Sequence, residues 1–327
     1  MIKIINSVSF LQVFGIILVV MGHIGYPNYI ETFLFHWIYS FHMPLFLFIS
    51  GYLFKHTYKA NTTYIDFIKK KVVRLIIPYV IISSIAYVPK YILNSFAIRK
   101  VELTLKSFIH RFFYPDTNPI IFFWFLPTLF IILITFFIIQ KLLNDNNFKY
   151  SLELGLLITL ALNLIVKFDT KLLNINGVFH YYFFFYLGYY FYCKEKIFYK
   201  IFFLKTKNTL FLLLGITLLN TFFYTQELPI LNIVISILGI FFSISLGEFY
   251  KTNNFKFLNH LYGFSFTIYL LSWFPQIFIR ITFFQILKLN FYVGFIFSVV
   301  LGIYVPFVIG SFIKNKGFKQ IQKLVGI

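Results

Sequence analysis

Charged residues are scarce in this chain: together they make up only 12% of its 327 residues, and just 10 of them are acidic. A soluble domain usually carries about 25% charged residues. Cysteine is scarcer still, because Cys193 is the only one, which excludes an intrachain disulfide and a cysteine-rich metal centre. Hydrophobic residues reach 60% instead, and aromatic residues alone 23%. This composition is typical of a protein whose helices lie in a membrane.

Apolar runs long enough to cross a bilayer recur along the whole chain. A helix needs about 20 residues to span the hydrocarbon. The runs are too long and too uniformly apolar for barrel strands, so we expect helices, which satisfy their own backbone groups in lipid. The sequence predicts an all-α, multi-pass membrane protein that forms a single domain over residues 1–327, with ten transmembrane segments at 6–26, 33–54, 73–93, 119–140, 151–168, 177–193, 208–225, 229–248, 262–284 and 291–313.

Lysine and arginine outnumber aspartate and glutamate by 29 to 10. In a multi-pass protein such an excess indicates orientation and not a nucleic-acid partner, because cytoplasmic loops collect Lys and Arg. With the N-terminus inside, 20 of the 29 basic residues fall in cytoplasmic segments. We therefore expect both termini in the cytoplasm and a protein embedded in the lipid bilayer of the cell (plasma or inner) membrane. Lys3 is followed by a long apolar run without a small-residue cleavage site, which predicts an uncleaved first segment.

The longest predicted segment outside the membrane is the outer loop at residues 94–118. It mixes basic residues such as Arg99 and Arg111 with apolar ones such as Leu105 and Phe112. Two interpretations stay open: an amphipathic helix lying in the membrane interface, or a solvated connector.

Carboxylates are missing from the middle of every predicted transmembrane segment, since all ten acidic residues fall in loops or at segment ends. A proton-coupled carrier usually keeps an intramembrane carboxylate, so ion-coupled transport is disfavoured. Two histidines lie in apolar runs instead: His23 ends GIILVVMGH, and His42 lies in SFHMPLFLFISGYLF. In the predicted antiparallel segments they lie roughly 5 Å and 14 Å below the outer surface.

A single buried histidine has a simple structural explanation, namely a neutral ring bonded to a carbonyl or a serine. Two of them at similar depth on adjacent segments favour a functional site, because ionisable side chains are costly in a membrane. Pro44 also favours a polar site, because it removes a backbone donor and frees the carbonyl of Ser40. Histidine, with an ordinary pKa near 6.5, can take a hydroxyl proton at neutral pH. We therefore expect acid–base chemistry at His23 and His42.

Basic residues open the third predicted segment in KKKVVRLIIPY, residues 69–79. Lysines in such a position usually extend to anionic headgroups. Arg74 differs because apolar residues flank it on both sides, and its planar guanidinium suits a phosphate. We expect Arg74, Lys70 and Lys71 to bind the phosphates of a cytosolic cosubstrate.

Taken in order, GIILVVMGH, FHMPLFLFISGYLF and RLIIPY resemble the membrane acyltransferase-3 family, and more closely its fucose 4-O-acetylase-like branch of sugar O-acetyltransferases. Three later stretches agree more weakly: FWFLPTLF at 123–130, FFFYLGYYF at 183–191 and YGFSFTIYLL at 262–271. The resemblance covers most of the chain, and FHMPLFLFISGYLF is its most specific part.

The resemblance implies a ten-helix membrane fold and acyl transfer, usually of acetyl from acetyl-CoA to a sugar hydroxyl in a surface glycan. The family's functional histidines fall on His23 and His42, and its arginine before the LxxPY pattern falls on Arg74. Acetyl-CoA is then the expected cosubstrate, with no bound cofactor and no metal. The expected acceptor is a sugar or polysaccharide, free or linked to a lipid.

Two departures from the family pattern concern the first and the penultimate segments. Many members carry an Asp-x-x-Arg pair before the first histidine, where this chain has Ser9 and Gln12. Many also carry a histidine before a proline in the penultimate segment, where this chain reads LLSWFPQIFIR. Trp273 in this stretch is equally well interpreted as an interfacial anchor. The residues expected to line the acceptor site are Ser50, Trp124, Ser272, Trp273 and Gln276.

We expect His23 to act as the general base on the sugar hydroxyl, or as a transient acyl carrier, and His42 to orient it or to stabilise the oxyanion. The rival hypothesis is a glycan-export or transport protein of the same fold without transfer chemistry. The retained His23, His42 and Arg74 favour the enzyme, whereas the two departures favour the rival. A purely structural scaffold explains neither the paired histidines nor the basic inner end.

Overall fold

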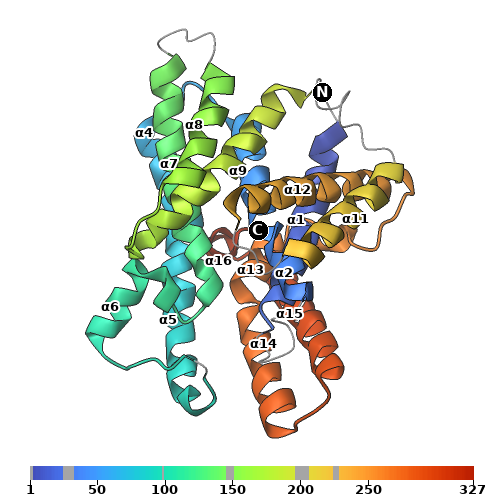
Figure 1. Cartoon of the computed structure of the whole chain (residues 1–327). Coiled ribbons are helices and arrows are strands. Elements are labelled where there is room, and N and C mark those ends of the chain that lie inside the picture. Colours follow the sequence, from blue (N-terminus) through green and yellow to red (C-terminus); the bar gives the residue numbers. More distant parts are fainter. Residues whose placement is uncertain (1–2, 25–32, 98, 145–150, 196–205, 224–227) are drawn as a thin grey trace. The chain divides into compact units, whose positions relative to one another are not determined.

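The computed structural model describes residues 3–24, 33–97, 99–144, 151–195, 206–223 and 228–327, and the regular secondary structure in these ranges is entirely helical (Figure 1). The chain groups into two compact units. The first unit comprises Met1–Thr57 and Phe184–Ile309. The second unit comprises Tyr58–Phe183 and Gly310–Ile327. Each of the ten segments predicted from the sequence contains helix in the described ranges.

The first unit contains both predicted histidines. Its helices are α1 (Lys3–Gly22), α2 (Phe33–Tyr39), α3 (His42–Thr57), the end of α9 (Ile175–Cys193), α11 (Thr206–Phe223), α12 (Pro229–Thr252), α13 (Ser265–Leu271), α14 (Trp273–Ile279) and the larger part of α15 (Phe291–Asn315), with a 3-10 turn at Asn259–Leu261 and a π-helical turn η7 at Arg280–Ile286. Buried apolar side chains from α1, α2, α11 and α12 form its core around the α2–α3 turn: Leu18, Ile38, Phe41, Leu212, Ile216, Ile235 and Phe242.

Two glycines allow α3 and the end of α9 to lie in close contact. A Cβ atom at Gly51 would overlap the carbonyl oxygen of Phe185, and one at Gly188 would overlap the carbonyl oxygen of Phe48. Small residues of this kind let helix backbones approach closely within a membrane. The two glycines belong to FHMPLFLFISGYLF and FFFYLGYYF, so two sequence stretches that carry the family resemblance pack against each other.

The predicted segment 33–54 is interrupted in the structure. A turn at residues 40 and 41 separates α2 from α3, and His42 is the first residue of α3. Pro44 explains the position of the turn, because it has no backbone N–H to bond the carbonyl of Ser40 and is tolerated only in the first turn of a helix. The predicted segment 262–284 is also broken, because α13 and the helix at Trp273–Ile286 meet at a bend of 47°.

The second unit contains Arg74 and the long predicted loop. Its elements are α4 (Tyr64–Lys71), the π-helical turn η1 (Val72–Ile76), α5 (Ile77–Ile92), η2 (Asn94–Phe96), α6 (Leu105–Phe113), η3 (Pro115–Thr117), η4 (Ile121–Trp124), α7 (Phe125–Asn144), α8 (Ser151–Ile165), η5 (Leu172–Asn174), the first part of α9, the end of α15 and α16 (Lys319–Val325). α4, η1 and α5 follow one another directly, and α16 packs against η1 and α5.

The segment at 94–118 contains the short helix α6. The hydroxyl of Tyr79 in α5 donates to two carbonyls near the end of α6, each at 3.2 Å. Leu105, Ile109 and Phe113 follow one another at intervals of four residues, and all three are exposed. A helix with an exposed apolar stripe favours the interfacial interpretation over the solvated connector.

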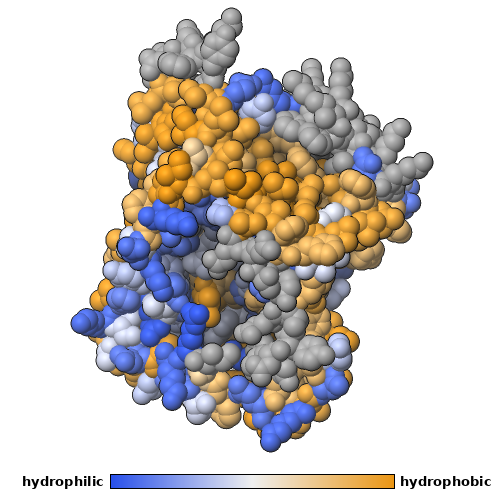
Figure 2. Space-filling model, in the orientation of Figure 1, coloured by the Kyte–Doolittle hydropathy of each residue, from blue (hydrophilic) through white to orange (hydrophobic). Residues whose placement is uncertain are grey.

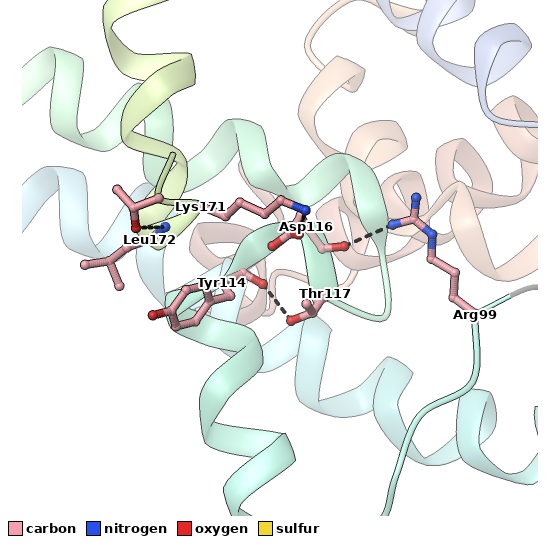
Figure 3. A network of polar contacts seen from close by, with 7 residues as sticks. Arg99, Tyr114, Asp116, Thr117, Lys171 and Leu172 are labelled. Carbon is pink, nitrogen blue, oxygen red and sulfur yellow. Dashed lines mark hydrogen bonds and ion pairs between the residues drawn. The ribbon is translucent and has the colours of Figure 1, made fainter. Parts of the chain in front are cut away.

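Polar contacts order the chain just after α6, as Figure 3 shows. Arg99 donates from Nη1 to the carbonyl of Asp116 at 3.1 Å, and Lys171 Nζ lies 3.2 Å from Asp116 Oδ2. The hydroxyl of Thr117 donates to the carbonyl of Tyr114 at 2.8 Å. Asp116 is thus held in a network of polar contacts with Arg99 and Lys171.

Within the described residues, five helical stretches are long and apolar enough to cross a membrane, or six when the bent pair at 265–286 is taken as one span. The five are Phe33–Thr57, Tyr64–Ile92, Ile121–Leu143, Pro229–Thr252 and Phe291–Asn315, and shorter apolar helices lie at Val8–Gly22, Leu152–Ile165 and Asn208–Phe223. Hydrophobic residues cover the face of α7 and α8, and that of α11, in Figure 2. The protein is therefore a helical membrane protein, whereas ten crossings and cytoplasmic termini stay predictions.

Candidate active site

His42 lies at the start of α3 with only 1% of its surface exposed. Its Nδ1 is 2.9 Å from the carbonyl oxygen of Ile38, the residue one turn earlier in α2. A carbonyl oxygen only accepts hydrogen bonds, so Nδ1 carries the proton of the neutral ring. Nε2 then keeps its lone pair, and this buried atom has no hydrogen-bond partner among the described residues. His42 therefore presents a proton acceptor.

His23 directly follows α1, and its backbone N–H bonds the carbonyl of Val19 at 3.1 Å. Its Nδ1 lies 3.1 Å from the hydroxyl of Tyr39, which also lies 3.3 Å from the carbonyl oxygen of Gly22. The hydroxyl has a single proton. The proton goes either to the carbonyl of Gly22, with Nδ1 of His23 donating to the tyrosine oxygen, or to Nδ1 itself.

Tyr39 contacts both imidazoles. Its ring centroid is 5.8 Å from that of His23 and 4.7 Å from that of His42, and both pairs meet edge to face. The structure thus brings His23 and His42 into one cluster, and it adds Tyr39, which the sequence did not single out. The only signal was its place three residues before His42, just ahead of the most specific stretch.

The turn before His42 is held by side chains from distant parts of the chain. Ser236 of α12 donates its hydroxyl to the carbonyl of Ser40 at 2.6 Å. Asn220 of α11 lies 3.5 Å from the hydroxyl of Ser40 and donates to the carbonyl of Ile216 at 2.9 Å. The carbonyl that Pro44 frees is therefore satisfied by the protein. Ser236 carries no sequence signal, because its role depends only on the packing of α12 against the turn.

The predicted donor-binding residues lie in the second unit. Lys70 and Lys71 end α4, and Arg74 lies in the π-helical turn η1. Lys70 and Arg74 are exposed, while Lys71 is half-buried with its Nζ 5.1 Å from the ring centroid of Phe67. An exposed guanidinium in a wide helical turn is available to a phosphate, and such turns are frequent at functional sites.

Four of the five predicted acceptor residues, namely Ser50, Ser272, Trp273 and Gln276, belong to the first unit. Gln276 is buried and donates from Nε2 to the carbonyl of Val20 at 2.7 Å, so it joins α14 to α1. Ser272 lies at the 47° bend, and its buried hydroxyl has no partner among the described residues. Trp273 and Ser50 are half-buried in the same unit.

Trp124 belongs to the second unit, where it stacks on Tyr181 at 5.2 Å between ring centroids. Within the described ranges, no three His, Cys, Asp or Glu side chains gather in a way that could hold a metal ion. Three acidic residues, Glu31, Asp145 and Glu227, lie outside those ranges.

Comparisons with known proteins place the chain in a family. Searches of curated proteins and of solved structures found no match. The family model described as an acyltransferase domain, that of the acyltransferase-3 family, matches residues 5–311, which is nearly the whole chain. The protein therefore belongs to the acyltransferase-3 family and is a membrane acyltransferase.

Proposed function

We propose that the protein is an O-acetyltransferase of the fucose 4-O-acetylase-like branch. It moves an acetyl group from cytosolic acetyl-CoA to a sugar hydroxyl of a surface or exported polysaccharide. The observation that carries the proposal is the lone pair on the buried, unpartnered Nε2 of His42 beside the ring of Tyr39. A sugar hydroxyl is a weak nucleophile, and an adjacent base is the usual means of activating it.

In this proposal His42 removes the hydroxyl proton. The sugar oxygen bonds to the acetyl carbon, the carbon–sulfur bond breaks, and the CoA thiolate leaves with the electron pair and finally receives the proton. The hydrogen bond to Ile38 leaves neutral His42 without an N–H on Nε2, so a role as oxyanion donor fits it less well than a role as base. His23 is the second essential imidazole, which shares the proton or carries the acetyl group in transit.

The donor's phosphates bind Arg74, Lys70 and Lys71 in the proposal. Arg74 supports this role because its guanidinium is exposed in the π-helical turn between α4 and α5. Lys70 and Lys71 add positive charge within one turn of the same helical stretch. Guanidinium groups bind phosphate oxygens in a two-pronged arrangement, which a lysine cannot reproduce.

The test is the transfer of radiolabelled acetyl from acetyl-CoA to glycan in membranes that contain the protein. His42→Asn keeps an N–H that can reach the carbonyl of Ile38 but removes Nε2, so the fold is kept and the base is lost. We expect transfer to fall by roughly 10²–10⁴-fold, the usual contribution of a general base. His56→Asn is the matched control, because His56 lies at the other end of α3 and bonds Tyr192 at 3.4 Å. Full activity of His42→Asn at an equal protein level would refute the role of His42.

A glycan-export protein without transfer chemistry is the second candidate. The residues that favour it are Ser9 and Gln12, which replace the family's Asp-x-x-Arg pair. Ser272 also favours it, because it stands where many family members have the histidine of the penultimate segment. The acetyl content of the surface polysaccharide, measured with and without the protein, separates the two. Export alone predicts less polysaccharide with an unchanged acetyl content, whereas transfer predicts the same polysaccharide with fewer acetyl groups.

A further inference from the structure

Both arginines that lie in apolar helices occupy π-helical turns. The chain has four arginines, and two of them, Arg99 and Arg111, belong to the segment at 94–118. Arg74 lies in η1, and Arg280 is the first residue of η7. A π-helical turn accommodates an extra residue at some cost in helix geometry and is frequent at functional sites. Arg280 has no role in the chemistry proposed above, so its position calls for a separate explanation.

Two contacts, one on either side of Arg280 in the sequence, join its helical stretch to α15 within the first unit. A Cβ atom at Gly302 would lie 3.3 Å from Cγ of Gln276, and one at Gly294 would overlap the ring of Phe284. Arg280 lies midway between Gln276 and Phe284, and residue 298 lies midway between the two glycines. Since residues four apart share a helix face, the register places the serine at position 298 across from Arg280.

Each side chain of this pair has one buried polar atom without a hydrogen-bond partner among the described residues. Ser298 is 1% exposed, and its hydroxyl has no hydrogen-bond partner in the described ranges. The same holds for the buried Nε of Arg280, and the described residues include no carboxylate paired with this guanidinium. A buried polar group without a partner costs about 1–3 kcal/mol, and more when it is charged. Such a pair in a native structure therefore points to a ligand that supplies the missing acceptors.

The position of Arg280 indicates what that ligand is. The backbone of Arg280 lies six residues before the end of η7 at Ile286, at most about 9 Å along the helix from the turn that joins η7 to α15. The exposed side chains of Leu287 and Leu289 suit that turn to the membrane surface. A flexible arginine at this depth reaches the headgroup level, where phosphate is the abundant oxyanion. Its fork of donors matches two phosphate oxygens, and the serine hydroxyl adds a third donor.

We propose that Arg280 and Ser298 form a binding site for a phosphate group carried by a membrane lipid. Two sources share this chemistry: the headgroup of a phospholipid, and the diphosphate of a lipid-linked glycan. The second source would present an acceptor glycan to the enzyme. The site does not depend on acyl transfer, because it consists of residues outside the histidine cluster.

The experiment measures binding of two probes to the purified full chain in a maltoside detergent, which contains no phosphorus. The probes are a short-chain phosphatidylglycerol and farnesyl diphosphate, each titrated by ³¹P NMR. We expect Arg280→Gln to weaken binding at least tenfold and Ser298→Ala to weaken it several-fold. Arg280→Lys keeps the charge but loses the two-pronged geometry. Its affinity for the probes should therefore lie between that of wild type and that of Arg280→Gln.

Arg99→Gln is the matched control, since it removes the same charge from the segment at 94–118 and should leave binding unchanged. If Arg280→Gln loses only the binding of phosphatidylglycerol, the ligand is a lipid headgroup. If Arg280→Gln loses the binding of farnesyl diphosphate, the ligand is the lipid-linked diphosphate. Either result supports the site. Equal binding of both probes to wild type and Arg280→Gln overturns it. The binding measurement does not depend on acyl transfer. A protein without transferase activity would therefore refute the proposed function without affecting this test of the phosphate site.

Discussion

His42 has two nitrogens with separate tasks. The ring reaches back one turn from the start of α3 and bonds the carbonyl of Ile38, near the end of α2. Carbonyls at the end of a helix have no intrahelical donor, and a nearby histidine can satisfy them. This bond orients the ring and leaves Nε2 for chemistry. The bond to Ile38 therefore gives a structural explanation for the buried histidine, and it is compatible with the proposed role of His42 as a base.

Tyr39 is the residue whose role can be tested most directly. Tyr39→Phe removes the hydroxyl that lies 3.1 Å from Nδ1 of His23 and keeps the ring beside His42. One neutral hydrogen bond contributes about 1 kcal/mol, so we expect kcat to fall about fivefold with KM unchanged. Tyr292→Phe is the control, because Tyr292 is exposed on α15. An unchanged kcat for Tyr39→Phe would show that the hydroxyl does not position His23.

At the scale of elements, α3 connects the site to the packing of the first unit. His42 begins the helix, and Gly51, nine residues later, meets the backbone of α9. The turn before α3 is stabilised by Ser236 of α12, which bonds the carbonyl of Ser40. Contacts along the whole helix therefore determine where the imidazole of His42 lies, because a rigid helix transmits a shift at one end to the other.

A pair of glycine substitutions tests this packing. Gly188→Ala places a Cβ atom onto the carbonyl of Phe48, and the overlap involves backbone that cannot turn away. We expect a loss of stability of about 1–3 kcal/mol, as for other overpacked sites. Gly215→Ala in α11 is the matched control, because no atom lies within 4 Å of the added Cβ. That variant should be neutral or more stable by about 0.5–1 kcal/mol.

The measurement for both glycine variants is thermal unfolding of the detergent-solubilised protein. Its readout is the fraction of protein that stays monodisperse after heating. A Gly188→Ala protein as heat-resistant as Gly215→Ala would mean that α3 and α9 do not approach as closely as the structure describes.

At the scale of the whole molecule, the chain is a membrane acyltransferase whose residues group into two compact units. The histidine cluster and Arg280 belong to the first unit, and Arg74 with its neighbouring lysines belongs to the second. The proposed reaction needs groups from both units, since one supplies the base and the other binds the donor. The family match at residues 5–311 includes residues of both units.

The single cysteine makes the orientation of the chain testable. In a Cys193→Ser background, Lys106→Cys and Lys316→Cys each introduce one thiol, and both lysines are exposed. The excess of basic residues in alternate loops predicts that Lys106→Cys reacts with a membrane-impermeant maleimide on intact cells, and that Lys316→Cys reacts only after permeabilisation. The reverse pattern, or labelling of both thiols from outside, would contradict a cytoplasmic C-terminus.

The sequence by itself determined the class of protein, its family and the position of its helices, because hydrophobic length and motif order are local properties. It also placed His23 and His42 in adjacent segments, and Pro44 correctly indicated a freed carbonyl at Ser40. It did not show the break that Pro44 produces, which lies within a continuous apolar run.

Only the tertiary structure decided which groups meet. It paired Ser236 with the carbonyl of Ser40, placed Tyr39 against both imidazoles and left Nε2 of His42 without a partner among the described residues. These contacts join residues whose sequence neighbourhoods look like ordinary apolar helix. They arise because close packing within the first unit, and not local composition, selects which few polar atoms are brought together.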